Sequence, residues 1–259
     1  MTLTLTTHTI LAEWVAQNLD NPHVRILDAR PNEFYADGHI PNALSVEMND
    51  FRHEQDGVEG MLLSPDEFAK KVGALGIDER VTVVIYDDYH GLLASRLAWS
   101  FLRYGHQNVM LLDGGWDEWE AGGYPISDQN PFIEPRTFIP RLNGSIYADL
   151  PYVRAHLNQK NHVLLDVRAI NEYEKGFIPN AILWDWQNGA SDNGLFGDLE
   201  ALRADLAEKG VTPDKEIITY CQSGVRASHT FFLLHQLGFK HVRLYDGSWL
   251  EWSTKVGAK

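Results

Sequence analysis

The stretch Leu27-Asp28-Ala29-Arg30, followed by Gly38-His39-Ile40-Pro41-Asn42-Ala43, decides the architecture because the chain contains it twice. It returns, at one constant offset, as Leu165-Asp166-Val167-Arg168 with Gly176-Phe177-Ile178-Pro179-Asn180-Ala181. Near the end of each half, Asp113-Gly114-Gly115-Trp116 returns as Asp246-Gly247-Ser248-Trp249. Three matches in the same order indicate a duplicated unit of roughly 120 residues.

Each half alternates strand-like and helix-like segments. Short runs rich in Val, Ile and Thr predict strands, and the stretches that follow end before a glycine, as helices commonly do. This alternation predicts an α/β fold in which a mostly parallel sheet is flanked by helices. The predicted strands are 24–27, 81–86, 109–112, 163–165, 216–220 and 242–245, and the predicted helices are 94–104 and 227–237.

The repeat also divides the chain. We expect a first domain at residues 1–122 and a second domain at residues 144–259. Residues 123–143 between them contain several prolines and little periodicity, which predicts an extended linker.

The composition excludes several kinds of partner. The chain has 259 residues and a formal net charge of −14, with no run rich in Lys or Arg. Such a surface repels nucleic-acid phosphates and anionic lipids, so we expect neither nucleic acid nor membrane as a partner. No apolar run reaches the roughly 18 residues that span a bilayer, and the first residues lack the pattern of a signal peptide.

The chain contains a single cysteine, Cys221, which excludes an intramolecular disulfide. A lone thiol suits a reducing compartment. We therefore expect the protein in the cytoplasm.

The two halves differ in the loop that follows their strongest predicted strand. The second half reads Cys221-Gln222-Ser223-Gly224-Val225-Arg226, whereas the first half has a loop one residue longer that begins at Asp87. Cys221 therefore stands where the first half has Asp87. Both loops leave the C-terminal end of a predicted parallel strand and enter a helix, which is where ligands bind in open α/β sheets.

This position favours Cys221 as a nucleophile. The pKa of a thiol falls near a helix N-terminus or a cation, and the following helix and Arg226 supply both. A loop this short turns its N–H groups toward one centre, where an anion binds, and Gly224 permits a conformation that a side chain forbids. The alternative is that Cys221 is a buried small hydrophobe, as most free cysteines are.

With these motifs the chain resembles the tandem-domain sulfurtransferases of the rhodanese family, which act on thiosulfate or 3-mercaptopyruvate. The resemblance rests on the Asp-x-Arg and Gly-His-Ile-Pro-x-Ala motifs, on the closing Asp-Gly-Ser-Trp-x-x-Trp motif, and on the six-residue loop that begins with Cys221. It implies two rhodanese-like domains, of which the first is inactive and the second is catalytic. It also implies that the reaction needs neither a metal nor an organic cofactor.

The resemblance implies covalent catalysis in two half-reactions. Cys221 takes a sulfur atom from a small-molecule donor, and a thiophilic acceptor such as cyanide then removes it. The substrate-binding residues that the resemblance implies are Gln222, Ser223, Gly224, Val225 and Arg226. The sequence does not define the oligomeric state, although we favour a monomer.

Two departures from the family pattern bear on the donor. Glu172 lies near the place of an additional arginine in the mercaptopyruvate enzymes, and the loop ends in Arg226 where those enzymes have Thr. Both favour thiosulfate, with 3-mercaptopyruvate as the alternative donor for the same nucleophile. A further departure from the family pattern is Phe177, which stands where the family usually has His.

Two other functions fit part of the pattern. Cysteine phosphatases also place a Cys-to-Arg loop before a helix, but with five intervening residues in place of the four seen here. The tighter loop suits one sulfur atom better than a phosphate. Some rhodanese-like domains serve only as binding modules, and the intact loop from Cys221 to Arg226 argues against that role for the whole chain.

Several other residues are expected to be structural. The sequence places His39 in a set of structural hydrogen bonds, and Arg168 in a strand-end contact from which it could add positive potential near Cys221. Four tryptophans recur three positions apart and are expected to pack in the core or at an interface: Trp116, Trp119, Trp249 and Trp252.

Overall fold

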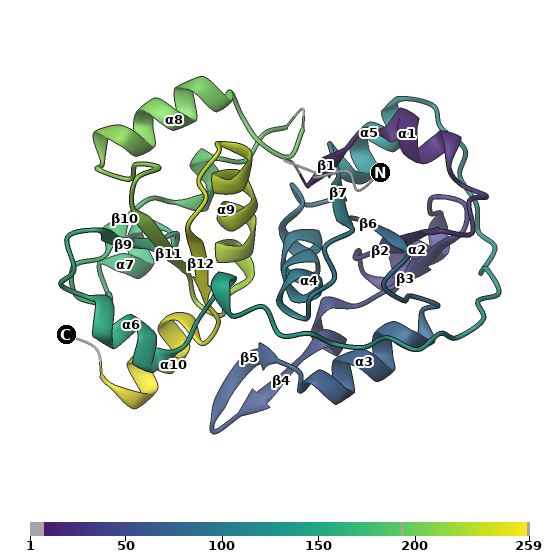
Figure 1. Cartoon of the computed structure of the whole chain (residues 1–259). Coiled ribbons are helices and arrows are strands. Elements are labelled where there is room, and N and C mark those ends of the chain that lie inside the picture. Colours follow the sequence, from purple (N-terminus) through teal and green to yellow (C-terminus); the bar gives the residue numbers. More distant parts are fainter. Residues whose placement is uncertain (1–7, 193, 258–259) are drawn as a thin grey trace.

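The computed structural model describes residues 8–192 and 194–257 and contains two similar α/β domains (Figure 1). The first domain is built on a parallel five-stranded sheet in the order β1-β7-β6-β2-β3. Its strands are β1 Thr9–Ile10, β2 Val24–Asp28, β3 Ala43–Ser45, β6 Thr82–Tyr86 and β7 Val109–Leu112.

The second domain repeats this topology. Its parallel sheet has the order β10-β9-β11-β12-β8, which is the first order read from the other edge. The α/β class and the duplication predicted from the sequence are therefore confirmed. Its strands are β8 Tyr147–Ala148, β9 His162–Asp166, β10 Ile182–Leu183, β11 Glu216–Tyr220 and β12 Val242–Tyr245.

Helices cover both faces of each sheet. In the first domain they are α1 Ala12–Gln17, α2 Asn32–Asp37, α3 Pro65–Ala74, α4 Leu92–Arg103 and α5 Gly115–Ala121. In the second domain they are α6 Leu150–His156, α7 Ile170–Tyr173, α8 Leu199–Glu208, α9 Val225–Gln236 and α10 Ser248–Lys255. The 3-10 helices are η1 Met48–Phe51, η2 Gly144–Ile146 and η3 Trp186–Asn188. No described helix is both long enough and apolar enough to cross a membrane.

The two domains share one hydrophobic core. Helices α4 and α9 face each other between the sheets, and most of their residues are buried (Figure 1). Phe101 of α4 and Phe231 of α9 belong to one continuous cluster of buried side chains. Burial on this scale holds the domains in a fixed relation, because separating them would expose a large apolar area.

The domain interface repeats one contact on each side. The carboxylate of Asp113 accepts a hydrogen bond from the backbone N–H of Leu195 at 2.8 Å. The matching carboxylate, Asp246, accepts one from the N–H of Leu62 at 3.2 Å. The loop after β7 thus holds a segment of the second domain, and the matching loop after β12 holds a segment of the first.

An antiparallel hairpin, β4 Arg52–Gln55 and β5 Val58–Leu62, reaches from the first domain toward the second (Figure 1). The sequence did not predict this hairpin. It matters for function because its strand β5 contacts α10, which follows the loop after β12 in the second domain.

Residues 123–143 contain no helix or strand and run along the first domain before entering the second (Figure 1). Backbone hydrogen bonds fix their path, from Ser127 with His39 to Arg136 with Gly73 and Arg141 with Tyr104.

Candidate active site

Cys221 directly follows β11 and is 1% exposed. Its loop is anchored from α10, because the carbonyl oxygens of Cys221 and Gln222 accept the N–H groups of Trp249 and Leu250 at 3.0 and 3.1 Å. The N–H of Cys221 donates to the Ser248 hydroxyl at 3.3 Å. The thiol is therefore carried on a rigid strand end, at the start of α9.

The matching loop of the first domain is filled by its own side chain. The buried carboxylate of Asp87 accepts four backbone N–H groups at 2.7–2.9 Å, from Tyr89, Gly91, Leu93 and Ala94. Burial raises the pKa of Asp87, and these four N–H groups oppose that shift. The loop is thus an anion cradle that an internal carboxylate occupies.

The Cys221 loop has the same form without an occupant of this kind. Gly224 takes a left-handed conformation, with φ of 84°, and is the N-cap residue of α9. Within the described residues, the four N–H groups that match the donors to Asp87 donate to no protein acceptor: those of Ser223, Gly224, Arg226 and Ala227. Unpaired N–H groups at a helix N-terminus bind anions, so this cradle suits a thiolate, a persulfide or an anionic donor.

Arg226 is less free than its place in the sequence indicates. Its guanidinium donates two hydrogen bonds to the Glu172 carboxylate, at 2.5 and 2.8 Å. Burial lowers the pKa of Arg226, whereas the hydrogen bond to Glu172 and the charge of a Cys221 thiolate raise it. The two raising effects outweigh burial, so the pKa of Arg226 lies above its usual value. The hydrogen bond from Arg226 likewise lowers the pKa of Glu172.

The first domain contributes a buried arginine that sequence reasoning missed. Arg96, on α4, forms an ion pair with Asp246 at 2.6 Å in which both side chains are 2% exposed. It presses on the loop, because a Cβ atom at Gly224 would lie 2.7 Å from Arg96 Nη1. Arg96 aligns with His229 in the repeat, and this unlike pair was the signal that could have identified it.

Arg52, on the hairpin, was also missed. A Cβ atom at Gly60 would lie 3.2 Å from the Ser223 Cβ atom and 3.5 Å from Arg52 Nη1, so the hairpin covers the loop. Burial and the charge of Arg96 lower the pKa of Arg52, whereas a Cys221 thiolate raises it.

The charges near Cys221 can be compared directly. Arg226, Arg96 and Arg168 each pair with a carboxylate. Arg52 forms no ion pair within the described residues, and its guanidinium is held by the Asn49 side chain. Among these four arginines, Arg52 is therefore the one whose positive charge no carboxylate of the described residues neutralises through an ion pair.

The expected structural roles of other residues are largely met. Arg168 is paired with Asp166 at 2.6 Å and stacks on Trp249, so its charge is neutralised locally. His39 bonds to the carbonyl oxygens of Tyr35 and Gln129. Trp119 and Trp252 are buried, whereas Trp116 stacks on Arg30. The described part of the chain contains no group of His, Cys, Asp and Glu side chains that could hold a metal ion.

Comparison with known proteins agrees with this architecture. The rhodanese-like domain family matches residues 11–122 and 149–255. The chain therefore belongs to the rhodanese family, with the domain present twice, and it is a sulfurtransferase of that family.

Two relatives align over nearly their whole length. The chain is 34% identical to the sulfur carrier protein TtuD of Thermus thermophilus, over 96% of this chain and 94% of that protein. It is also 34% identical to a Mycobacterium bovis protein provisionally named thiosulfate sulfurtransferase 1, over 96% and 95% of the two chains.

Solved structures share the fold. SseA from Escherichia coli, described as a 3-mercaptopyruvate sulfotransferase, superposes with a TM-score of 0.87 at 25% identity and covers 94% of this chain and 99% of its own. An anaerobic ergothioneine biosynthesis enzyme from Chlorobium limicola also gives 0.87, over 97% of this chain and 69% of its own. At 24% identity, that second likeness shows the fold alone.

Proposed function

We propose that the protein moves a sulfane sulfur from thiosulfate to a thiophilic acceptor such as cyanide, through a persulfide on Cys221. The thiolate attacks the outer sulfur of thiosulfate, the S–S bond of the donor breaks, and sulfite leaves with the bonding electron pair. Cyanide then attacks the outer sulfur of the persulfide, which yields thiocyanate and restores the thiolate. Atoms and charge balance in both steps, with no cofactor.

One observation carries this proposal: the four N–H groups that Asp87 occupies in the first loop have unpaired counterparts around Cys221. These groups can stabilise the thiolate before attack and the anionic persulfide after it. In this proposal Gln222, Ser223, Gly224, Val225 and Arg226 form the substrate-binding loop. The first domain has no nucleophile at the matching position.

The thiol is almost fully covered, so a donor needs a route to it. The hairpin lies over Ser223 and has Gly57 and Gly60 in left-handed conformations. In this proposal the hairpin moves to admit the donor, and Arg52 moves with it. The lone thiol fits a reducing compartment such as the cytoplasm.

The choice of donor rests on the charges of the loop. Arg52, which forms no ion pair within the described residues, suits a small dianion, whereas Arg226 is paired with Glu172 and adds less positive charge. Glu172 lies near the place where the mercaptopyruvate enzymes have an additional arginine, so that contact for the donor carboxylate is absent here. 3-Mercaptopyruvate is the alternative donor, and the likeness to SseA supports it. Comparing kcat/KM for the two donors with one acceptor decides between them.

The acceptor also has a second candidate. The relative TtuD is named a sulfur carrier protein, which favours a protein acceptor for the Cys221 persulfide in place of a small molecule. Single-turnover transfer from the isolated persulfide to cyanide and to a protein thiol compares the two.

Mass spectrometry of the intact protein tests the central step. After treatment with thiosulfate, the wild type gains the mass of one sulfur atom, and cyanide removes it. The Cys221→Ser variant keeps its fold and gains nothing. If thiosulfate and 3-mercaptopyruvate both leave the wild-type thiol unmodified, the proposed function is wrong.

A further inference from the structure

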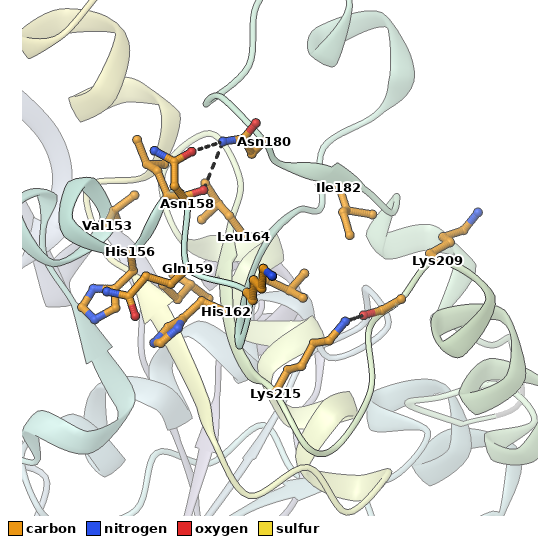
Figure 2. A pocket seen from close by; sticks show the side chains of 15 residues that line it. Val153, His156, Asn158, Gln159, His162, Leu164, Asn180, Ile182, Lys209 and Lys215 are labelled. Carbon is orange, nitrogen blue, oxygen red and sulfur yellow. Dashed lines mark hydrogen bonds between the residues drawn. The ribbon is translucent and has the colours of Figure 1, made fainter.

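A second open site lies at the opposite end of the second sheet from Cys221. It is a cavity of about 450 Å³ among the start of β9, the end of α6 and the turn after α8 (Figure 2). Its floor is apolar and includes Val163 and Ile182, while Lys160, Lys209 and Lys215 line its rim.

The first domain has the same framework at the matching place. The Asn180 side-chain amide donates to the Leu157 carbonyl oxygen and to the Asn158 side chain. Asn180 and Asn158 are both labelled in Figure 2. Its counterpart Asn42 makes the same two bonds, to Leu19 and Asp20. The first domain therefore serves as an internal reference for what this framework accommodates.

In the first domain an extended segment of the chain covers this place. A Cβ atom on Gly76 would lie 2.5 Å from Ile133 Cγ2 and 3.0 Å from the Glu134 carbonyl oxygen. Three residues on, the N–H of Arg136 donates to the Gly73 carbonyl oxygen at 2.8 Å. Residues 133–136 thus lie across the turn after α3, with an apolar side chain directed at a glycine.

The second domain has the glycine but no covering segment. Gly210 matches Gly76 and also has a positive φ, yet the nearest atom to a Cβ there is Lys215 Nζ at 3.8 Å. Val163 stands where the first domain has Arg25, whose guanidinium lies 3.2 Å from the same Cβ position on Gly76. The shorter side chain and the absent segment together leave the cavity open among the described residues.

The charges around the open cavity, called the groove from here on, differ from those at the covered place in the first domain. In the first domain, Arg136 of the covering segment contacts the carboxylate of Asp78 at 3.5 Å and the Pro22 carbonyl oxygen at 3.4 Å. The second domain has Thr212 in place of Asp78 and Lys160 in place of Pro22. The groove therefore no longer suits a basic segment.

The surroundings of the groove are positive in an otherwise acidic protein. Its described lining residues include three lysines and two histidines but no Asp or Glu, although the chain carries a net charge of −14. Nearby carboxylates offset part of this charge, since Asp205 lies 3.8 Å from Lys209 and Glu216 lies 3.6 Å from His162. Lys160 has no ion pair within the described residues.

We propose that this groove docks an extended acidic segment of a partner protein. The segment places an apolar side chain over Gly210, as Ile133 lies over Gly76, and directs its carboxylates to Lys160, Lys209 and Lys215. Apolar contact sets the register, and opposite charge selects the partner.

The test uses two labelled peptides and the full-length protein. One peptide has the sequence of residues 129–138 of this chain, and the other carries the Arg136→Glu change. By fluorescence anisotropy, the acidic peptide binds the wild type with a Kd about tenfold lower than that of the unchanged peptide. Equal affinities, or no binding of either peptide, overturn the proposal.

Variants place the binding in the groove. Lys160→Glu removes the charge contact, and Val163→Arg restores the side chain that fills the first domain, so each weakens binding of the acidic peptide about tenfold. Lys70→Glu, at an exposed position on α3, leaves binding unchanged. Melting temperature and sulfur transfer at Cys221 report whether each variant is folded. If Val163→Arg does not fold, the Lys160→Glu variant alone decides whether the peptide binds in the groove.

A small anion is the competing occupant. If inorganic phosphate alone displaces the acidic peptide, or if binding survives Lys160→Glu, the groove is not a peptide-docking site. Because the groove and Cys221 lie at opposite ends of the sheet, either result leaves the proposed sulfur transfer unaffected.

Discussion

The guanidinium of Arg226 is joined to the carboxylate of Glu172 by two hydrogen bonds, at 2.5 and 2.8 Å. The residues come from different elements, α9 and α7, and both side chains are partly exposed. An ion pair has little net charge, so Arg226 attracts a dianion less strongly than a free guanidinium does. Glu172 is thereby expected to limit the affinity of the loop for thiosulfate.

Replacing Glu172 with Gln tests this relationship. The change leaves a hydrogen-bond acceptor for Arg226 but removes one negative charge. We expect kcat/KM for thiosulfate to rise about fivefold, which corresponds to about 1 kcal/mol at a partly solvated site, with most of the change in KM. Glu174→Gln, at the exposed position two residues on, is the control. A decrease in kcat/KM would mean that Glu172 chiefly positions Arg226.

Arg52 is predicted to attract the donor from the first domain. It has no carboxylate partner within the described residues, and a Cys221 thiolate raises its pKa, which places the two charges within each other's influence. Arg52→Gln is expected to lower kcat/KM for thiosulfate about fivefold. It is expected to change much less the reaction of Cys221 with the uncharged donor methyl methanethiosulfonate, which transfers a methylthio group to the thiolate and releases methanesulfinate. Arg154→Gln, on the exposed side of α6, is the control. Equal losses with both donors would show that the side chain only supports the hairpin.

The fold could be predicted because its pattern is local and occurs twice. Strand β11 was predicted at its observed bounds, and helix α9 begins two residues earlier than predicted because Gly224 turns the chain directly into it. The hairpin was missed, since Arg52–Leu62 is short and polar, has glycines at 57 and 60, and lacks a clear period of two.

The loop residues around Cys221 could be predicted because they are consecutive. Arg52 and Arg96 could not, because they approach from the other domain and their roles depend on how the domains pack. The ion pair of Arg226 with Glu172 was not foreseen either, although both residues had been singled out. Sequence motifs identify a loop, whereas the net charge around it depends on tertiary contacts.

Asp87 and Cys221 predict an exchange of stability for activity. A carboxylate at position 221 could accept the unpaired N–H groups of its loop, as Asp87 does in the first domain. Cys221→Asp is therefore expected to melt about 3–6 °C above Cys221→Ser, while neither variant transfers sulfur. Asp87→Ser is the reciprocal change and is expected to lower the melting temperature. If Cys221→Asp melts below Cys221→Ser, the second loop does not form the same cradle.

His229 predicts how stability depends on pH. Its buried ring lies between Trp186 and Phe196, with centroids 5.3 and 5.1 Å away, and burial lowers its pKa from 6.5 to about 4. Below pH 6.5 the unfolded chain binds a proton that the folded chain excludes, so the free energy of unfolding decreases as the pH falls toward 4.

The His229→Gln variant isolates this effect. Between pH 7 and pH 5 the wild type is expected to lose about 2 kcal/mol more of its free energy of unfolding than the variant does, as measured by urea denaturation. Gln keeps a donor for the Leu195 carbonyl oxygen, which His229 contacts at 3.2 Å. A difference in absolute stability between the wild type and the variant does not affect the test, because only the change with pH is compared. His241→Gln, at an exposed position, should retain the wild-type dependence. If all three proteins respond alike to pH, His229 is not buried in its neutral form.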